Sequence, residues 1–254
     1  MIKVIIQGRE PMKYAIFGDI HSNLEALTAV LEKAEQEEVD KYICTGDIVG
    51  YNADPFECLN KIRELQPDVI VRGNHDDYIG SEIDLLGFNP QAAHVVEWTR
   101  EHLNPEDRQW LAELPLSKTV NHNTTIVHAT LDMPGRWGYI FDKFNAMSSF
   151  NYQYTPICFF GHTHIPSKFE KFGGVNGDGG FEEIILQPGH KYMINPGSAG
   201  QPRDGDSRAA MAIYDTEEKL ITLHRVEYDI ETAQKKIRNS SLPERCAERL
   251  ALGR

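Results

Sequence analysis

Five short polar segments of this sequence carry side chains that bind metal ions in proteins, and each follows an apolar stretch. In chain order they are Asp19-Ile20-His21, Gly46-Asp47, Gly73-Asn74-His75-Asp76, His128 and Gly161-His162-Thr163-His164. Carboxylate and amide oxygens together with imidazoles suit Mn²⁺, Fe or Zn²⁺ better than thiolate-binding ions. Each segment alone has a common structural explanation, because Asp and Asn cap helices and a single His is often hydrogen-bonded in a core. Together they favour a metal site, because capping requires neither histidines nor a common direction.

The pair His162 and His164 is informative by itself. With one residue between them, both imidazoles can reach one centre only if the backbone turns there, and the preceding Gly161 permits such a turn. A shared centre also requires that the segments preceding the other side chains end at the same place in the fold.

The apolar stretches in the first half indicate how the five segments are positioned. Strands expected over 12–17, 41–46 and 67–73 alternate with helices expected over 23–38, 54–65 and 89–103. This alternation predicts a mainly parallel sheet. Loops at the carboxyl ends of such strands converge on one crevice, so we expect the five segments to share a site.

The second half is richer in strands. A hairpin is expected from 116–120 and 124–129, followed by strands at 156–161, 167–172, 181–186, 191–195, 208–215 and 219–229. Residues 173–180, with the sequence GGVNGDGG, and residues 215–219 are predicted to be turns. The apolar spacing over 230–252 predicts one or two terminal helices that pack back on the domain.

Length and composition indicate one α/β domain over residues 1–254. We expect a helical segment at 228–254. Residues 1–11 are a possible appendage, with Met12 as an alternative start. The 26 basic and 38 acidic residues give a net charge of -12, which disfavours bulk binding of nucleic acid. No apolar run approaches the roughly 20 residues needed to cross a membrane, and no signal peptide is recognisable. We therefore expect a cytoplasmic protein without membrane association. The four cysteines are far apart and are expected to be free, buried thiols.

The ordered series GDIH, GDIVG, GNHD, a lone histidine and GHTH resembles the calcineurin-like metallophosphoesterase superfamily, from Met12 to about Asp215. The stretch NPGSAGQPRDGD is similar to the small prokaryotic branch that includes diadenosine-tetraphosphatase-like proteins and phosphodiesterases. The resemblance implies a four-layer α/β/β/α sandwich of two mixed sheets. It also implies hydrolysis of small phosphoesters, either diesters or monoesters, by attack of a hydroxide that bridges two divalent metal ions.

The resemblance also implies a ligand set. The first metal ion would take Asp19, His21, Asp47 and His164, and the second would take Asp47, Asn74, His128 and His162. The expected ions are two Mn²⁺, with Fe, Zn²⁺, Ni²⁺ or Mg²⁺ as alternatives. Their positive charge would invert the acidic surface field at the site, so that an anionic phosphoester or nucleotide can bind.

His75 resembles the general acid of this superfamily, and Asn74 and His75 would both contact the substrate. Many relatives carry an Asp and an Arg where this chain has Gly50 and Tyr51, so either Asp76 or Asp54 would have to orient His75. The missing arginine disfavours a phosphoprotein phosphatase.

Two further side chains are candidates for substrate binding. Arg203 is either a phosphate contact or an ordinary surface arginine, and Trp137 either stacks on the substrate or covers core. Two other functions stay open, namely a dinucleoside polyphosphate hydrolase and a non-catalytic metal-binding scaffold. The oligomeric state and the natural substrate are not indicated.

Overall fold

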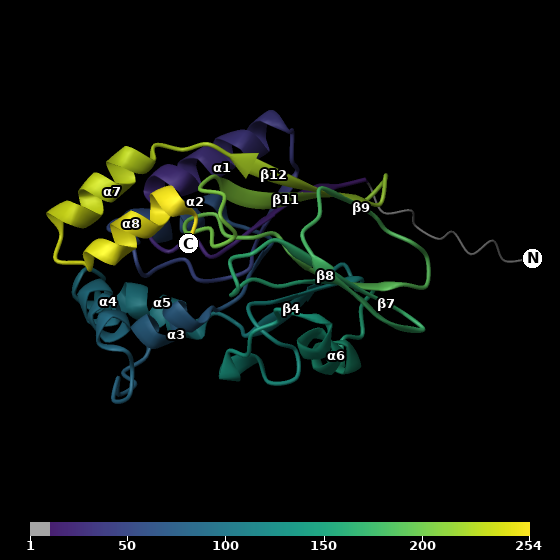
Figure 1. Cartoon of the computed structure of the whole chain (residues 1–254), viewed down its shortest axis with the longest axis horizontal. Coiled ribbons are helices and arrows are strands. Elements are labelled where there is room, and N and C mark those ends of the chain that lie inside the picture. Colours follow the sequence, from purple (N-terminus) through teal and green to yellow (C-terminus); the bar gives the residue numbers. More distant parts are fainter. Residues whose placement is uncertain (1–10) are drawn as a thin grey trace, which may run out of the picture.

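The computed structural model describes residues 11–254, so the predicted appendage lies, apart from Pro11, outside the described residues. Two six-stranded sheets face each other (Figure 1). The first sheet has the strand order β3 (Val69–Ile70), β2 (Lys41–Cys44), β1 (Lys13–Phe17), β11 (Ala209–Asp215), β12 (Leu220–Val226) and β9 (Glu183–Ile185). The second has the order β4 (Ser117–Val120), β5 (Thr124–Val127), β6 (Ile157–Phe159), β10 (Lys191–Asn195), β7 (Ser167–Phe172) and β8 (Gly174–Gly179).

Helices cover the outer faces of both sheets. Over the first sheet lie α1 (Leu24–Gln36) and α2 (Pro55–Leu65), while α7 (Ile230–Asn239) packs against α1 and is followed by α8 (Glu244–Leu252). The second sheet is covered by α6 (Lys143–Tyr152), and at one end of the sandwich lie α3 (Asn74–Gly80), α4 (Pro90–Glu101) and α5 (Pro105–Glu113). The four-layer α/β/β/α sandwich of two mixed sheets is therefore confirmed.

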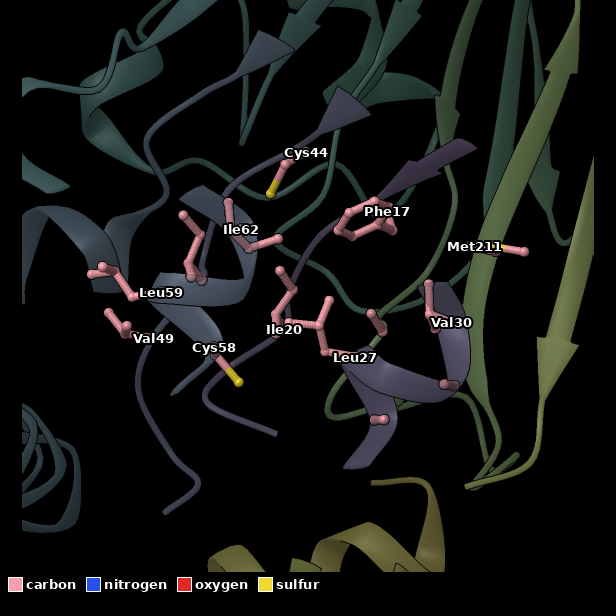
Figure 2. Packing of buried hydrophobic residues seen from close by; sticks show 14 of the residues in the cluster. Phe17, Ile20, Leu27, Val30, Cys44, Val49, Cys58, Leu59, Ile62 and Met211 are labelled. Atoms are coloured by element: carbon pink, nitrogen blue, oxygen red, sulfur yellow. The ribbon is translucent and has the colours of Figure 1, made fainter. Parts of the chain in front are cut away.

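Alternating side chains of the strands fill separate cores. In β1, Ile16 faces the second sheet and packs with Phe159 and Ile194, whereas Phe17 faces the helices. Figure 2 shows Phe17 packed with Leu27 and other apolar side chains between the first sheet and α1 and α2. Both faces of this sheet are buried, which explains why β1 is almost continuously apolar.

Local sequence accounts for the helix that follows β1. The side chain of Asn23 accepts a hydrogen bond from the backbone N–H of Ala26 at 3.1 Å and so caps α1. Leu27, Val30 and Ala34 then recur at helical spacing and are buried. The predicted helix is confirmed, and it begins directly after the loop that carries the first polar segment.

The sheets are more mixed than the sequence predicted. Strands β1, β2 and β3 are parallel, as expected, but β11 pairs antiparallel with β1 and with β12. The prediction of a mainly parallel sheet is therefore right for the first three strands and wrong for the sheet as a whole. The predicted hairpin of β4 and β5 is confirmed.

The predicted turn over 173–180 is wrong, because most of it forms β8, which pairs antiparallel with β7. Backbone hydrogen bonds to a neighbouring strand need no side chains, so glycine-rich composition did not prevent pairing. A short turn at 216–219 does join β11 to β12, as predicted. The segment after Asp142 forms α6, whose Phe144, Met147 and Tyr152 are exposed and define no single apolar face.

The C-terminal segment forms two helices, as predicted. Ile237 of α7 and Leu250 of α8 are buried in a cluster with Val95 and Trp98 of α4.

All four cysteines are free and buried, which was also expected. Within the described range, none of the helices has the length and apolarity that crossing a bilayer requires.

We predict that Phe17→Ala lowers the free energy of unfolding by about 3–5 kcal/mol, because it leaves a cavity in a fully buried position. Urea denaturation followed by circular dichroism measures this change. Phe144→Ala is the matched control, since Phe144 is 69% exposed, and its effect should stay within about 0.5 kcal/mol. Equal losses in the two variants would contradict the described core.

Candidate metal centre

The loops at the carboxyl ends of β1, β2, β5 and β6 bring the predicted ligands together. Two groups of buried side chains form, and within each group the possible ligand atoms lie within 4.8 Å of one another. The first group is Asp19, His21, Asp47 and His164, and the second is Asp47, His128 and His162. Asn74, at the start of α3, lies beside the second group, with Oδ1 at 3.3 Å from Nε2 of His128. The expected convergence is therefore confirmed, and Asp47 belongs to both groups.

The backbone at these positions is unusual. Five of the clustered residues have a φ between 48° and 70°, namely Asp19, His21, Asp47, His162 and His164. This left-handed region costs a non-glycine residue about 1–3 kcal/mol, and such strain concentrates at functional sites. The histidines therefore make the turn that was expected of Gly161. Gly161 is required for a different reason, since a Cβ there would meet Oδ2 of Asp19 at 2.8 Å.

Buried hydrogen bonds hold this backbone in place. The carboxylate of Asp76 accepts from the backbone N–H groups of Asp47 at 2.8 Å, Ile48 at 2.9 Å and Gly73 at 3.0 Å. The side-chain amide of Asn195, at the end of β10, donates to the carbonyl of Gly161 in the loop after β6 at 2.7 Å. These bonds offset part of the strain, because they satisfy polar groups that no water can reach.

The two carboxylates are oriented by backbone donors. Oδ1 of Asp47 accepts from the N–H of His75 at 2.8 Å, which leaves Oδ2 at 3.3 Å from Nε2 of His128. Both oxygens of Asp19 lie 3.1 Å from the N–H of His162, and Oδ1 is 3.5 Å from Nε2 of His164. Each carboxylate thus presents an oxygen to the imidazoles of its group.

Each clustered imidazole has one ring nitrogen next to a backbone carbonyl. The pairs are Nδ1 of His21 with Val49 at 3.2 Å, Nδ1 of His128 with Thr45 at 2.8 Å, Nδ1 of His164 with Gln201 at 2.7 Å, and Nε2 of His162 with Trp137 at 2.9 Å. A carbonyl only accepts, so each of these nitrogens carries the proton in a neutral ring. The other nitrogen of each ring then directs a lone pair into the cluster, as in metal-binding histidines.

The closest pair of these nitrogens supports a cation site. Nε2 of His21 and Nε2 of His164 lie 3.0 Å apart. Two neutral imidazoles that both donate from Nδ1 have only lone pairs at Nε2, so this contact is repulsive unless a proton or a cation lies between or beside them. The donor set and its geometry therefore fit the divalent ions that the sequence implied.

The charges and pKa values of the clustered groups also support a cation site. Burial, which favours neutral groups, holds the pKa values of His21 and His164 well below their usual range and lowers that of His162 to about 3. Burial also raises the pKa of Asp19 to about 7, His128 opposing this shift and Asp47 adding to it. For His128, attraction to Asp47 outweighs burial and raises the pKa to about 9. At neutral pH the proton on His128 therefore balances the charge of Asp47, and a bound cation would displace this proton from Nε2 and leave its lone pair as a ligand.

His75 lies at the edge of the cluster. Its ring contacts that of His21 edge-on at 4.8 Å and that of Tyr51 at 4.4 Å, and burial lowers its pKa to about 4. Its Nδ1 is buried without a hydrogen-bond partner among residues 11–254. A Cβ on Gly50 would meet this nitrogen at 2.6 Å, so a side chain at position 50 would lie directly against it.

Neither carboxylate expected to orient His75 does so. Asp76 is engaged with the backbone amides described above, and Asp54 pairs with Lys236 at 2.9 Å. The structure therefore corrects the sequence-based role of Asp76: its carboxylate fixes the loop that carries Asp47. A residue adjacent to a histidine in sequence need not share its direction, because successive side chains at a helix start diverge by about 100°.

The two predicted substrate contacts lie on different sides of the cluster. The guanidinium of Arg203 is 5.6 Å from the ring of Tyr51, on the side of His21 and His164. The ring of Trp137 is 6.0 Å from that of His128, on the other side. Both are only partly buried. Tyr139, two residues after Trp137, stacks on His162 with ring centroids 4.1 Å apart.

The family model for the calcineurin-like phosphoesterase superfamily domain matches residues 12–219. The chain belongs to this superfamily. The match covers every residue of the two ligand groups, and it ends before α7 and α8.

Similar proteins match nearly the whole length of this chain. An uncharacterized protein of Methanocaldococcus jannaschii is 41% identical over 243 residues, covering 94% of this chain and 98% of that protein. A metallophosphoesterase from Sphaerobacter thermophilus, known from its crystal structure, is 38% identical with a TM-score of 0.85, covering 96% of this chain and 100% of that one. A hypothetical protein from Pyrococcus horikoshii, 23% identical over 95% of this chain and 98% of that one, shares the fold with a TM-score of 0.78.

We predict that Mn²⁺ or Zn²⁺ raises the melting temperature of the dialysed protein. A site that binds only the folded state stabilises it by about 2.7 kcal/mol when the free ion is at 100 times its dissociation constant. Differential scanning fluorimetry measures the shift.

Asp47→Asn should abolish most of this stabilisation, because Asp47 belongs to both groups. Asp54→Asn is the control that removes a carboxylate outside the cluster and should keep it. A shift that persists in full in the Asp47 variant would show that the ions bind elsewhere.

Proposed function

We propose that this phosphoesterase hydrolyses small phosphoesters, either diesters or monoesters, with two divalent metal ions that share Asp47. The observation that carries this proposal is the arrangement of the four clustered histidines. Each has one nitrogen fixed by a backbone carbonyl and the other turned toward the carboxylates. Such preorganisation of lone pairs serves metal binding and has no use in a merely hydrogen-bonded core.

The residues divide between two metal positions. Asp19, His21 and His164 would hold the first ion and Asn74, His128 and His162 the second, with Asp47 common to both. Two bound cations supply Lewis acidity toward phosphoryl oxygens and lower the pKa of water. The ions proposed are Mn²⁺ first, then Fe, Zn²⁺, Ni²⁺ or Mg²⁺.

His75 is proposed as the proton donor to the leaving oxygen. It lies beside His21 at the edge of the cluster, where a phosphoester bound by the ions would extend. The imidazole is neutral near pH 7 because burial lowers its pKa. The negative charge of a bound phosphate raises the pKa of an adjacent imidazole, so the substrate itself promotes protonation.

The other side of the cluster supports binding of a flat apolar group. Tyr139 stacks on His162, and Phe141 stacks on Tyr139 with ring centroids 5.1 Å apart. Both rings are about half exposed, and Trp137 lies beside them in sequence and against His128. An aryl or nucleobase group of the substrate would pack against this surface. We further expect one cytoplasmic domain, as the sequence predicted.

We predict that a metal-reconstituted screen of monoesters, diesters and nucleotide anhydrides detects hydrolysis, which Asp47→Asn removes. His75→Ala should lower kcat by about 10²–10⁴ on alkyl phosphoesters, because their leaving oxygen needs a proton. The loss should be much smaller on p-nitrophenyl esters, whose leaving group departs as a stable anion. Steady-state kinetics on both ester classes measures the difference.

Two results would count against this function. A His75→Ala loss of equal size on both ester classes would remove the assigned role of proton donor. A metal-loaded protein inactive on every phosphoester would instead favour the non-catalytic scaffold.

We predict that Trp137→Ala changes the preference among leaving groups more than the rate on a minimal aryl phosphate. The physical reason is that Trp137 offers contact area to the substrate without touching the phosphate itself. Ratios of kcat/KM for nucleotide esters and for the minimal substrate measure the change. If both values fall equally, Trp137 does not form a specificity surface and supports His128 instead.

A further inference from the structure

The loop after β2 reaches from the metal centre to the C-terminal helices. It carries Asp47, which belongs to both ligand groups, and it ends with Asp54 at the start of α2. Between these two lies Tyr51, whose ring centroid is 4.4 Å from that of His75 and 4.7 Å from that of His21. The position of this loop therefore decides where the ring of Tyr51 lies against the proposed proton donor.

Hydrogen bonds hold the loop on the side of the metal centre. The backbone N–H of Asp54 donates to the carbonyl of Ser22 at 3.1 Å. The side-chain amide of Asn52 donates to the carbonyl of His21 at 2.7 Å. Tyr51 itself has a φ of 60°, in the left-handed region that is strained for a residue with a side chain. Such a conformation persists only where the surrounding structure supports it, so the other side of the loop matters as well.

Helix α7 supports that other side through an ion pair. Lys236 of α7 pairs with Oδ2 of Asp54 at 2.9 Å and with Oε1 of Glu25, in the first turn of α1, at 2.5 Å. The side chains of Asp54 and Glu25 are each 14% exposed, so water screens these pairs less than pairs on an open surface. Asp54 precedes α2 but makes no capping hydrogen bond with its side chain, which leaves the carboxylate to Lys236.

Apolar contacts join the same loop to the C-terminal helices. Tyr51 and Ala53 pack against the cluster that α4, α7 and α8 share, which includes Trp98, Ile237 and Leu250. Helix α7 in turn packs on α1 (Figure 1). The family model ends before α7, so the residues that define the superfamily do not account for this helix.

The charge of Lys236 keeps two carboxylates together. Within residues 11–254, neither Asp54 nor Glu25 pairs with another basic side chain. Without Lys236, these carboxylates would be partly desolvated like charges on facing elements, which repel each other. Their repulsion would move the loop away from α1, and with it the ring of Tyr51 away from that of His75.

We propose that Lys236 and Asp54 are positioning residues for His75, and that α7 acts through them on the loop of Tyr51. This inference rests on the proposed function, in which His75 donates a proton to the leaving oxygen. A displacement of about 1 Å in a reacting group can slow catalysis about a hundredfold, so a contact away from the metal ions can control this proton transfer. Metal binding should not depend on the contact, because both residues lie outside the two ligand groups.

Hydrogen exchange of the full-length protein tests the contact independently of activity. We expect the backbone amides of residues 50–54 to exchange at least about tenfold faster in Lys236→Gln and in Asp54→Ala than in the wild-type protein. Asp54→Ala keeps the pair of Lys236 with Glu25, so it releases the loop while α7 stays paired with α1. Lys235→Gln is the matched control, because Lys235 is exposed in the same turn of α7, and it should change exchange less than twofold.

Steady-state kinetics of the metal-loaded protein gives a second readout. Lys236→Gln and Asp54→Ala should lower kcat on an alkyl phosphodiester about 10–100-fold with little change in KM, and should affect a p-nitrophenyl ester much less. Lys236→Arg, which keeps the charge, should restore most of the rate. The metal-dependent rise in melting temperature should remain in every variant.

Three results would overturn the positioning role. They are unchanged exchange at 50–54 in both variants, losses of equal size on the two ester classes, and effects of Lys235→Gln as large as those of Lys236→Gln. If the wild-type protein hydrolyses no phosphoester but exchange at 50–54 depends on Lys236 and Asp54, the proposed function fails and the support of the loop by α7 stands.

Discussion

The structure depends on the burial of two carboxylates among four imidazoles at the end of two sheets. Asp19 and Asp47 are essentially inaccessible to solvent, and the imidazoles around them are mostly too buried to carry a charge. Unpaired negative charge in such surroundings is strongly destabilising. Three features of the site hold these groups in place for a cation. They are the surrounding loops, the backbone carbonyl next to each histidine, and the membership of Asp47 in both groups.

The backbone of the clustered residues is strained by the conformation that holds these groups in place. Five clustered residues adopt the left-handed conformation, which glycine would adopt more easily, but glycine has no side chain to bind a metal. The fold offsets this cost with buried hydrogen bonds, chiefly those that backbone N–H groups of the Asp47 loop donate to the carboxylate of Asp76. Asp76 therefore matters to the site through the backbone, although it does not face the reacting groups.

Local patterns in the sequence allowed the alternation of strands and helices and the clustered residues to be predicted, whereas the four layers were implied by the resemblance to the superfamily. Apolar strands such as 12–17 end in polar residues, and strand ends meet at one edge of a sheet. The role of Asp76 was not predictable, since direction at a helix start depends on tertiary hydrogen bonds. The strand β8 was missed because its glycines pair through backbone atoms alone.

The absence of a side chain at Gly50 has a consequence for the kind of bond that is cut. In the described structure nothing charged fixes the proton on Nδ1 of His75, and only the rings of His21 and Tyr51 hold this imidazole in place. An alkoxide demands a full proton, so the proposed hydrolysis of an alkyl ester would depend on how often this histidine is protonated. A departing phosphate is already stable as an anion and would depend on that proton less. We therefore expect the small residue next to His75 to matter less to the cleavage of an anhydride than to that of an alkyl ester.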